Sequence, residues 1–483
     1  MNSLSAKTQE VLKWFEQISA IPRKSGNEAK IRQWLLNWAK QNSFDGKADK
    51  AGNALIKIPG TPGLETAPTI VIQGHMDMVC EKTPDSPHDF TKDPIEFVYD
   101  GEWLKANKTT LGADNGIAIA IAIAMIMDKS VAHPPLELLF TVDEETGLSG
   151  ANNLPSKQLE GKILLNLDSE DEGVFTIGCA GGCTTENTLP LEFKKPGTAL
   201  KAYHVKIDGL KGGHSGVDIK LQRGNAIKLL ARALFAVISE HHFELAGIKA
   251  GTVHNAIPRS GEAIILFEKS KEKAIETILQ DIEGTFKKEL ENVDDDFSIT
   301  LETSTIKGSE GLTKGSLKKV LNVLMALPHG VATMATAIPG LVETSNNLAT
   351  VHIENNKLKL TTSQRSSITS RMQALTQRIH STMELAEGAA KDCSSYPPWE
   401  PNWSSDLLEK CKAIYKNNFG KDPIVEVIHA GLECGVIGSK YPGMDMISYG
   451  PTIKFPHSPD EKLKISDIDK IWDFTAALFE SYK

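Results

Sequence analysis

The stretch Thr141-Val142-Asp143-Glu144-Glu145-Thr146-Gly147 decides how this chain is organised. It follows the largely apolar run 136–140, so three consecutive acids stand where a buried strand is predicted to end and a glycine-containing turn to begin. Carboxylates this close repel one another unless a cation offsets their charge, and a divalent metal ion would do so. Neighbouring side chains of an extended segment point opposite ways, so one of Glu144 and Glu145 can bind an ion while the other stays free as a base. A solvated acidic turn is the alternative.

Length, charge and hydropathy set the class of protein. A chain of 483 residues is too long for one compact core, so two or more domains are expected. The 62 acids outnumber the 53 Lys and Arg residues, which argues against nucleic acid or an anionic membrane as a partner. The N-terminal residues lack a basic start followed by an apolar core, and the longest apolar run, 117–127, is too short to span a bilayer. A cytoplasmic location with six reduced thiols is therefore expected.

Other predicted elements also end or begin at residues that commonly bind metals. A strand over 69–73 ends in Gly74-His75-Met76-Asp77. A helix over the Ile/Ala-rich run 117–127, buried on all sides, has Asp114 at its N-terminal end, where an N-cap role is compatible with metal binding. A strand over 162–167 is followed by Asp168, although the acids at 170–172 compete with it for the same role. The sequence thus predicts one site built at strand ends.

The middle of the chain has a different character. From 185 to 392 the predicted strands and amphipathic helices have no acid clusters at the strand ends, and a similar order of elements occurs twice. We therefore predict an α/β fold: a catalytic domain (1–184 and 393–483) with a mixed sheet flanked by helices, and an inserted α+β lid domain (185–392) of two similar halves. The returning segment supplies a late histidine, His457.

Imidazole and carboxylate groups form the predicted donor set, which suits zinc or a similar divalent ion. Its members are His75, Asp114, Glu145, Asp168 and His457. Five protein ligands are too many for one open catalytic zinc ion, so they suit two ions that share a carboxylate.

The strings around these residues resemble the signatures of the M20 family of co-catalytic metallopeptidases, in order and over nearly the full length. The resembling strings are Gly74–Asp77, Gly112-Ala-Asp-Asn-Gly116, Asp143–Gly147 and the late His457. Gly212-Gly-His-Ser-Gly-Val-Asp218, His429-Ala-Gly-Leu-Glu-Cys-Gly435 and the long lid are similar to the aminoacyl-histidine dipeptidase branch of that family.

The resemblance implies two divalent metal ions per chain, zinc before manganese or cobalt. Asp114 would bridge the two ions. His75 and Asp168 would hold one ion, and Glu145 and His457 the other.

Two further residues have implied roles beside the ions. Asp77 would accept a hydrogen bond from His75 and fix its tautomer. Glu144 would be the general base that takes a proton from water and returns it to the leaving amine.

The resemblance also implies substrate-binding residues in the lid. His214 would donate a hydrogen bond to the developing oxyanion, from its own or a partner subunit. Arg365, at a predicted strand end, would pair with the free carboxylate of a dipeptide through its planar fork. Asn255 would contact substrate, and Gly431 and Glu433 are candidates for lining the pocket, although a tight turn explains Gly431 equally well.

The implied activity is hydrolysis of Xaa-His and related dipeptides, such as β-alanyl-histidine. An N-acyl amino acid deacylase or a carboxypeptidase of the same family is the first alternative, and a non-catalytic metal-containing peptide-binding protein is the second. The implied partner is a dipeptide, and a homodimer is a candidate assembly.

Overall fold

The computed structural model describes residues 4–304, 310–336 and 338–483, and the chain divides into two compact units. The first unit consists of Met1–Cys179, Trp399–Val427 and Leu432–Lys483, and the second of Ala180–Pro398 and Ile428–Gly431. The boundaries predicted near 185 and 392 fall inside strands β9 (Gly181–Pro190) and β21 (Ala389–Tyr396), which pair with one another in the second unit.

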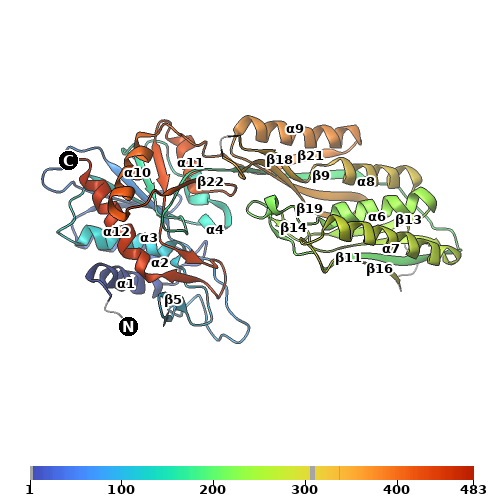
Figure 1. Ribbon diagram of the computed structural model, residues 1–483, viewed down its shortest axis with the longest axis horizontal. Coiled ribbons are helices and arrows are strands. Elements are labelled where there is room, and N and C mark those ends of the chain that lie inside the picture. Colours follow the sequence, from blue (N-terminus) through green and yellow to red (C-terminus); the bar gives the residue numbers. More distant parts are fainter. Residues whose placement is uncertain (1–3, 305–309, 337) are drawn as a thin grey trace. The chain divides into compact units, whose positions relative to one another are not determined.

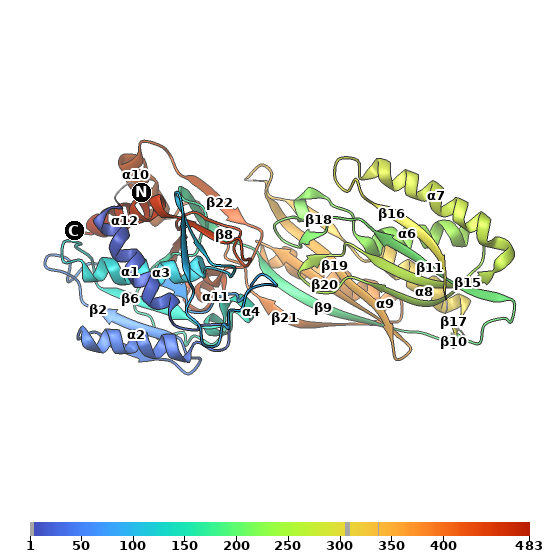
Figure 2. The same ribbon diagram turned by 90° about the horizontal axis from the view of Figure 1, so that it is seen from below.

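An eight-stranded mixed sheet forms the centre of the first unit (Figures 1 and 2). Its strands, in spatial order, are β1 (Asp45–Ala48), β2 (Ala54–Ile58), β6 (Leu136–Thr141), β3 (Ile70–His75), β7 (Ile163–Asn166), β23 (Asp445–Ser448), β8 (Val174–Cys179) and β22 (Ile424–Ile428). β3 pairs in parallel with β6 on one side and with β7 on the other. The carboxyl ends of these three strands therefore meet at one edge of the sheet.

Buried apolar residues explain the arrangement of the inner strands and helices. Every residue of β3 and β6 is buried, as parallel strands with covered faces require. The helices of this unit are α1 (Ala6–Ser19), α2 (Ala29–Gln41), α3 (Ala113–Met127), α4 (Glu144–Gly147), α5 (Ser149–Asn152), α10 (Asp406–Phe419), α11 (Glu433–Lys440) and α12 (Ile465–Glu480). α3 packs against β3, α1 and α12, and its residues 115–125 are buried. The prediction of a helix buried on all sides is therefore confirmed.

A small antiparallel sheet extends the first unit. Its strands, in spatial order, are β24 (Ile453–Lys454), β25 (Lys462–Lys464), β5 (Trp103–Ala106) and β4 (Phe97–Asp100). The loop between β24 and β25 carries His457 and Glu461.

A nine-stranded antiparallel sheet forms the second unit (Figure 1). Eight strands run in the order β16 (Ser298–Thr303), β11 (Leu200–Asp208), β15 (Gly261–Glu268), β13 (Glu244–Ala250), β19 (Val342–Glu354), β20 (Lys357–Ser366), β9 and β21, and β18 (Gly330–Met334) also pairs with β19. Helices α7 (Glu272–Glu289), α6 (Ala226–Glu240), α8 (Lys314–Ala326) and α9 (Thr369–Leu385) pack side by side against the sheet. Their apolar side chains and those of the strands form one core.

Two short antiparallel ribbons complete the second unit. β10 (Phe193–Lys194) pairs with β17 (Gly311–Leu312), and β12 (Gly213–His214) pairs with β14 (Ala256–Ile257). Among the described residues, no helix is both long and apolar enough to cross a membrane.

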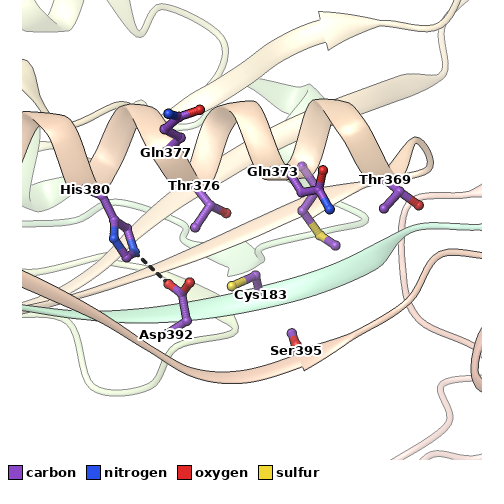
Figure 3. Close-up of a pocket in the computed structure, with 9 residues that line it drawn as sticks. Cys183, Thr369, Gln373, Thr376, Gln377, His380, Asp392 and Ser395 are labelled. Atoms are coloured by element: carbon purple, nitrogen blue, oxygen red, sulfur yellow. Dashed lines mark hydrogen bonds and ion pairs between the residues drawn. The ribbon is translucent and has the colours of Figure 1, made fainter.

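A cavity of about 430 Å³ lies between α9 and the strands β9 and β21 (Figure 3). His380 and Asp392 point toward one another across it, with Nε2 and Oδ1 2.9 Å apart. Burial, and then the charge of Asp392, raises the pKa of the Cys183 thiol in its wall. This thiol is free, and its raised pKa keeps it protonated at neutral pH.

Candidate metal centre

The five predicted donors lie together in the first unit. His75 is the last residue of β3, Glu145 lies in the helical turn after β6, and Asp168 follows β7. These three strands are parallel neighbours, so their ends converge without any sequence proximity. The start of α3 brings Asp114 and the β24–β25 loop brings His457 to the same place.

Asp114 stands between the two histidines. Its Oδ1 lies 3.0 Å from His75 Nε2, and its Oδ2 lies 3.0 Å from His457 Nε2. His457 Nε2 also lies 3.0 Å from Glu145 Oε2, and His75 Nε2 lies 3.5 Å from Asp168 Oδ1. Three groups have potential ligand atoms within 4.8 Å of one another: His75, Asp114 and Asp168; Asp114, Glu145 and His457; and His75, Glu144 and Glu145.

Electrostatics in this cluster reflect several acids crowded around two imidazoles. Burial would raise the pKa of Asp114, but hydrogen bonds with His457 and His75 hold it well below its usual value. The same contacts, with Asp114 first and Glu145 second, raise the pKa of His457 to about 11. Burial would lower the pKa of His75, but Asp168 and Asp114 raise it well above its usual value. The two histidines thus supply the positive charge that divalent ions would supply in a loaded centre.

The residues fit divalent ions in composition and in hydrogen bonding. Imidazole nitrogens and carboxylate oxygens are the donors that zinc and similar ions take from proteins. Glu145 Oε1 is buried without a hydrogen-bond partner, and such an atom is costly unless something positive binds it. A divalent ion bound by Glu145 through this oxygen would satisfy it.

Asp77 lies directly behind His75 and orders the acidic stretch. Its Oδ1 lies 3.3 Å from His75 Nδ1, and its two oxygens accept the backbone N–H groups of Glu144 (3.0 Å) and Glu145 (3.2 Å). Ser25 donates a further hydrogen bond of 2.8 Å. Burial would raise the pKa of Asp77, but the contacts with His75 lower it to about 2. The carboxylate therefore stays charged and leaves His75 Nε2 facing the cluster.

Glu144 belongs to the group with His75 and Glu145 and lies outside the two groups that share Asp114. Burial raises its pKa well above the usual value, and the charges of Asp168 and Glu145 add to this against the opposing effect of His75. A carboxylate in such a setting has a high affinity for a proton.

Two details of local geometry differ from the expectation. Glu144 and Glu145 were expected on an extended segment, but they form the first turn of α4, because both of their N–H groups bind Asp77. Asp114 and Asn115 have non-helical φ/ψ within α3, just before its continuous buried part, and the two oxygens of Asp114 are engaged by the histidines instead of by the start of that helix. The side chains of Glu144 and Glu145 therefore point in different directions because consecutive residues of a helical turn do so, and not because they alternate along a strand.

Asp171 and Glu172, which competed with Asp168 for the role of ligand, have partners outside the cluster, whereas Glu170 lies near it. Asp171 pairs with Lys454, and Glu172 contacts Tyr415 and Lys470. Glu170 is held near the cluster, where burial and then the charge of Asp114 raise its pKa to about 8.

Several buried charged residues surround the donors, and two of them, Arg23 and Glu461, lie outside every motif quoted from the sequence. Glu461 accepts hydrogen bonds from the backbone before Asp114, and Arg23 donates to the backbone after His75. Glu433, expected at a pocket wall, is fully buried instead, with its Oε2 2.6 Å from both Gln73 Nε2 and Thr141 Oγ1. Burial raises the pKa of Glu433 to about 8. The sequence beside Glu433 is largely apolar, whereas Arg23 and Glu461 have charged neighbours, so nothing local in the sequence indicates that these two residues are buried.

The predicted lid residues lie in the second unit. His214 in β12 pairs across the ribbon with Ala256, and the carbonyl of Asn255 accepts the N–H of Ser215 at 2.8 Å. A Cβ added at Gly216 would lie 3.2 Å from His214 Cε1 and 3.3 Å from Arg365 Cδ. The structure therefore brings His214 and Arg365 together, with Asn255 on the same ribbon.

Arg365 is held by a tyrosine. Its Nη1 donates to Tyr396 Oη at 2.9 Å, and its Nε is buried without a hydrogen-bond partner. The Tyr396 ring lies between Gly182 and Gly431, where an added Cβ would come within 2.5 Å and 2.8 Å of ring carbons. Gly431 therefore makes room for Tyr396, which adds a packing reason to its predicted place near the substrate.

A donor set of this composition at the strand ends of a mixed α/β sheet is typical of metal-dependent hydrolases. The chain belongs to peptidase family M20/M25/M40, whose sequence pattern matches residues 71–481.

Relatives of known name match the chain from end to end. The cytosol non-specific dipeptidase of Escherichia coli (strain K12) is 37% identical over 482 residues, which are 99% of each chain. The crystal structure of aminoacylhistidine dipeptidase from Vibrio alginolyticus has a TM-score of 0.88 and 38% identity, and the match covers 99% of this chain and 97% of that one. A tripeptidase from Staphylococcus aureus, with a TM-score of 0.57, 15% identity and 99% coverage of both chains, shares the fold.

Proposed function

We propose that this protein is a two-metal dipeptidase that hydrolyses Xaa-His and related dipeptides. The observation that carries the proposal is Asp114, whose two carboxylate oxygens each face a different donor group. The full-length similarity to two dipeptidases supports dipeptides as substrates over N-acyl amino acids. The name of the relative from Escherichia coli supports a cytoplasmic location.

The proposed ligands are those of the two groups that share Asp114. His75, Asp114 and Asp168 would hold one ion, and Asp114, Glu145 and His457 the other. Bound divalent ions, zinc before manganese or cobalt, would lower the pKa of a water molecule at the centre and polarise the substrate carbonyl.

The chain's own residues carry the proton and orient the donors. Glu144 accepts a proton from the attacking water and returns it to the leaving amine, a role that its raised pKa supports. Asp77 accepts Nδ1–H of His75, which keeps the tautomer with a free Nε2.

Residues of the second unit bind the substrate in this proposal. Arg365 receives the C-terminal carboxylate, which supplies the partner that its buried Nε lacks. His214 donates to the developing oxyanion, from its own chain or from that of a homodimer partner. Asn255 and Gly431 line the same region.

We also propose that the second unit is a lid built of two similar halves. The support is the order of elements, which runs strand, helix, strand, strand, helix, strand both in β11–α6–β13–β15–α7–β16 and in β9–α8–β19–β20–α9–β21. In the sheet, the strands of the first set lie in the order β13, β15, β11, β16, and those of the second set lie in the order β19, β20, β9, β21. Strands at the same place in the two sets therefore occupy the same place in the two halves of the sheet.

A substrate panel combined with a Glu144 variant tests the proposal. Wild-type protein reconstituted with Zn²⁺ should hydrolyse β-alanyl-histidine and α-aminoacyl-histidines faster than N-acetyl amino acids. Glu144→Ala should abolish turnover while two metal ions per chain remain bound. Hydrolysis of N-acyl amino acids alone would favour a deacylase, and bound metal without hydrolysis of any dipeptide would favour a peptide-binding protein. An active Glu144→Ala variant would refute the assignment of the base.

A further inference from the structure

Two buried residues of opposite charge, Arg23 and Glu461, join the chain segments that carry three of the proposed metal ligands. Arg23 is 1% exposed and Glu461 is 2% exposed. A buried charge is costly unless it is paired and hydrogen-bonded, so the position of both residues in the core needs a compensating contact. Burial lowers the pKa of Arg23, and the charge of Glu461 is the first of those that oppose this effect.

Glu461 binds the backbone that leads to Asp114. Its Oε2 accepts the N–H groups of Leu111 (2.8 Å) and Gly112 (3.0 Å), and its Oε1 accepts those of Ala113 (2.8 Å) and Asp114 (3.3 Å). Glu461 lies in the same loop as His457, between β24 and β25. One carboxylate therefore fixes the segment of Asp114 relative to the segment of His457.

Arg23 binds the same loop and the end of β3. Its Nη2 donates to the carbonyl of Gly112 at 2.5 Å, and its Nη1 donates to the carbonyls of Met76 (3.2 Å) and Asp77 (2.9 Å). The planar guanidinium can direct donors at two segments at once. Arg23 therefore fixes the segment of His75 relative to the segment of Asp114.

The two glycines of Gly112-Ala-Asp-Asn-Gly116 leave space for the guanidinium. Gly112 has a φ of +67°, and a Cβ there would lie 2.5 Å from Arg23 Nη2. A Cβ at Gly116 would lie 2.6 Å from the same atom. Both glycines of this motif are thus explained by the close approach of Arg23.

We propose that Arg23 and Glu461 are positioning residues that set the spacing of His75, Asp114 and His457, and thereby the affinity of the centre for divalent ions. The inference rests on the proposed function in its choice of metal ligands, but it does not depend on which amide is cleaved. Residues that orient metal ligands typically change metal affinity by about 10- to 100-fold when they are replaced.

Glu461→Gln tests this in the full-length protein. The amide nitrogen of Gln replaces one carboxylate oxygen and faces two backbone N–H donors, so the loop before Asp114 loses two of its four hydrogen bonds. We expect the affinity for Zn²⁺, measured by competition with a chromophoric chelator, to fall by about 10-fold or more. The visible absorption of the Co²⁺-loaded variant should also change, because the spectrum reports the geometry of the ligands.

Glu137→Gln is the matched control. Glu137 is 1% exposed, its Oε2 accepts the N–H groups of Glu160 (2.9 Å) and Gly161 (3.0 Å), and its Oε1 lies 3.3 Å from Lys57 Nζ, but it lies near the opposite end of β6 from the centre. This variant should lower the Tm of the metal-free protein and leave the Zn²⁺ affinity within about twofold.

Arg23→Lys keeps the positive charge but lacks the planar guanidinium that binds two segments at once. This variant tests the positioning role if Glu461→Gln does not fold. It should lower Zn²⁺ affinity in the same direction, and the double variant should lose less than the product of the two single losses. Unchanged affinity and an unchanged Co²⁺ spectrum in Arg23→Lys, or an equal loss of affinity in Glu137→Gln at equal Tm, would refute the positioning role. A wild-type protein that binds no divalent ion would refute the proposed centre itself.

Discussion

Replacing Asp77 by Asn removes the negative charge of this side chain and keeps its shape. Each oxygen of Asp77 accepts one backbone N–H, from Glu144 or Glu145, and Oδ1 also faces His75 Nδ1. In either orientation the new amide nitrogen faces a backbone donor. If it replaces Oδ1, its N–H groups also face His75 Nδ1, which then keeps only the backbone carbonyl of Asp77, 3.2 Å away, as an acceptor; this favours the tautomer with the proton on Nε2.

The size of the effect follows from these contacts. Loss of one hydrogen bond to a buried carboxylate costs about 1.5 to 3 kcal/mol of unfolding free energy. A misplaced proton on His75 competes directly with the metal, so we expect Zn²⁺ affinity to fall by about 10- to 100-fold, or about 1.4 to 2.7 kcal/mol. Stability and Zn²⁺ affinity should fall together, because the same Asp77 carboxylate contacts the start of α4 and His75.

Chelator competition and thermal unfolding of the metal-free protein measure the two quantities. Asp294→Asn is the control, because Asp294 is equally buried and accepts the N–H groups of Lys211 (2.7 Å) and Gly224 (2.7 Å) in the second unit. It should lose a similar amount of stability and keep its Zn²⁺ affinity. Asp77→Asn with wild-type affinity would show that the Asp77 contact does not control the tautomer of His75.

Three further predictions concern other residues. Arg365→Lys should raise KM for free dipeptides by about tenfold, because Lys lacks the fork, while dipeptide amides should be unaffected; an equal change for both substrates would contradict carboxylate binding. Glu433 has a folded pKa of about 8 against a usual 4.5, so its stabilising contribution is present below pH 4.5 and is lost as the pH rises through 8. The unfolding free energy of metal-free Glu433→Gln, measured with urea, should therefore rise relative to that of the metal-free wild type by about 1.4 kcal/mol per pH unit between pH 5 and 8. Unfolding free energies that depend on pH in the same way in both proteins would contradict this. Gly431→Ala should lower the unfolding free energy by about 1 to 3 kcal/mol through its contact with Tyr396, and Tyr396→Ala should relieve that clash in the double variant.

The parts of the site that depend on local pattern were predictable from the sequence. A buried run followed by a histidine or an acid identified His75, Glu145 and Asp168 at strand ends, and the structure places these strands side by side. The predicted M20 family is confirmed by the match over residues 71–481. The roles of the individual residues stay predictions.

The features that depend on contacts across the chain were not predictable. The helical turn at Glu144 arises from Asp77, which lies 67 residues earlier. Glu461 reaches the backbone of Leu111 across 350 residues, and no local period indicates such a contact. The burial of Glu433 likewise depends on Gln73, which belongs to a distant strand.

The ribbon of β10 and β17 places Lys194 opposite Gly311, so the stretch between them, which carries β11, β13, β15, β16, α6 and α7 of the second unit, begins and ends at one point. Excision of this stretch with a short turn in its place would remove those four strands together and leave β9, β18, β19, β20 and β21 whole. Excision would uncover the hydrogen-bonding edge of β19 at Val351 and His352, which β13 now covers. A shortened chain would thus present a new edge for association with another molecule.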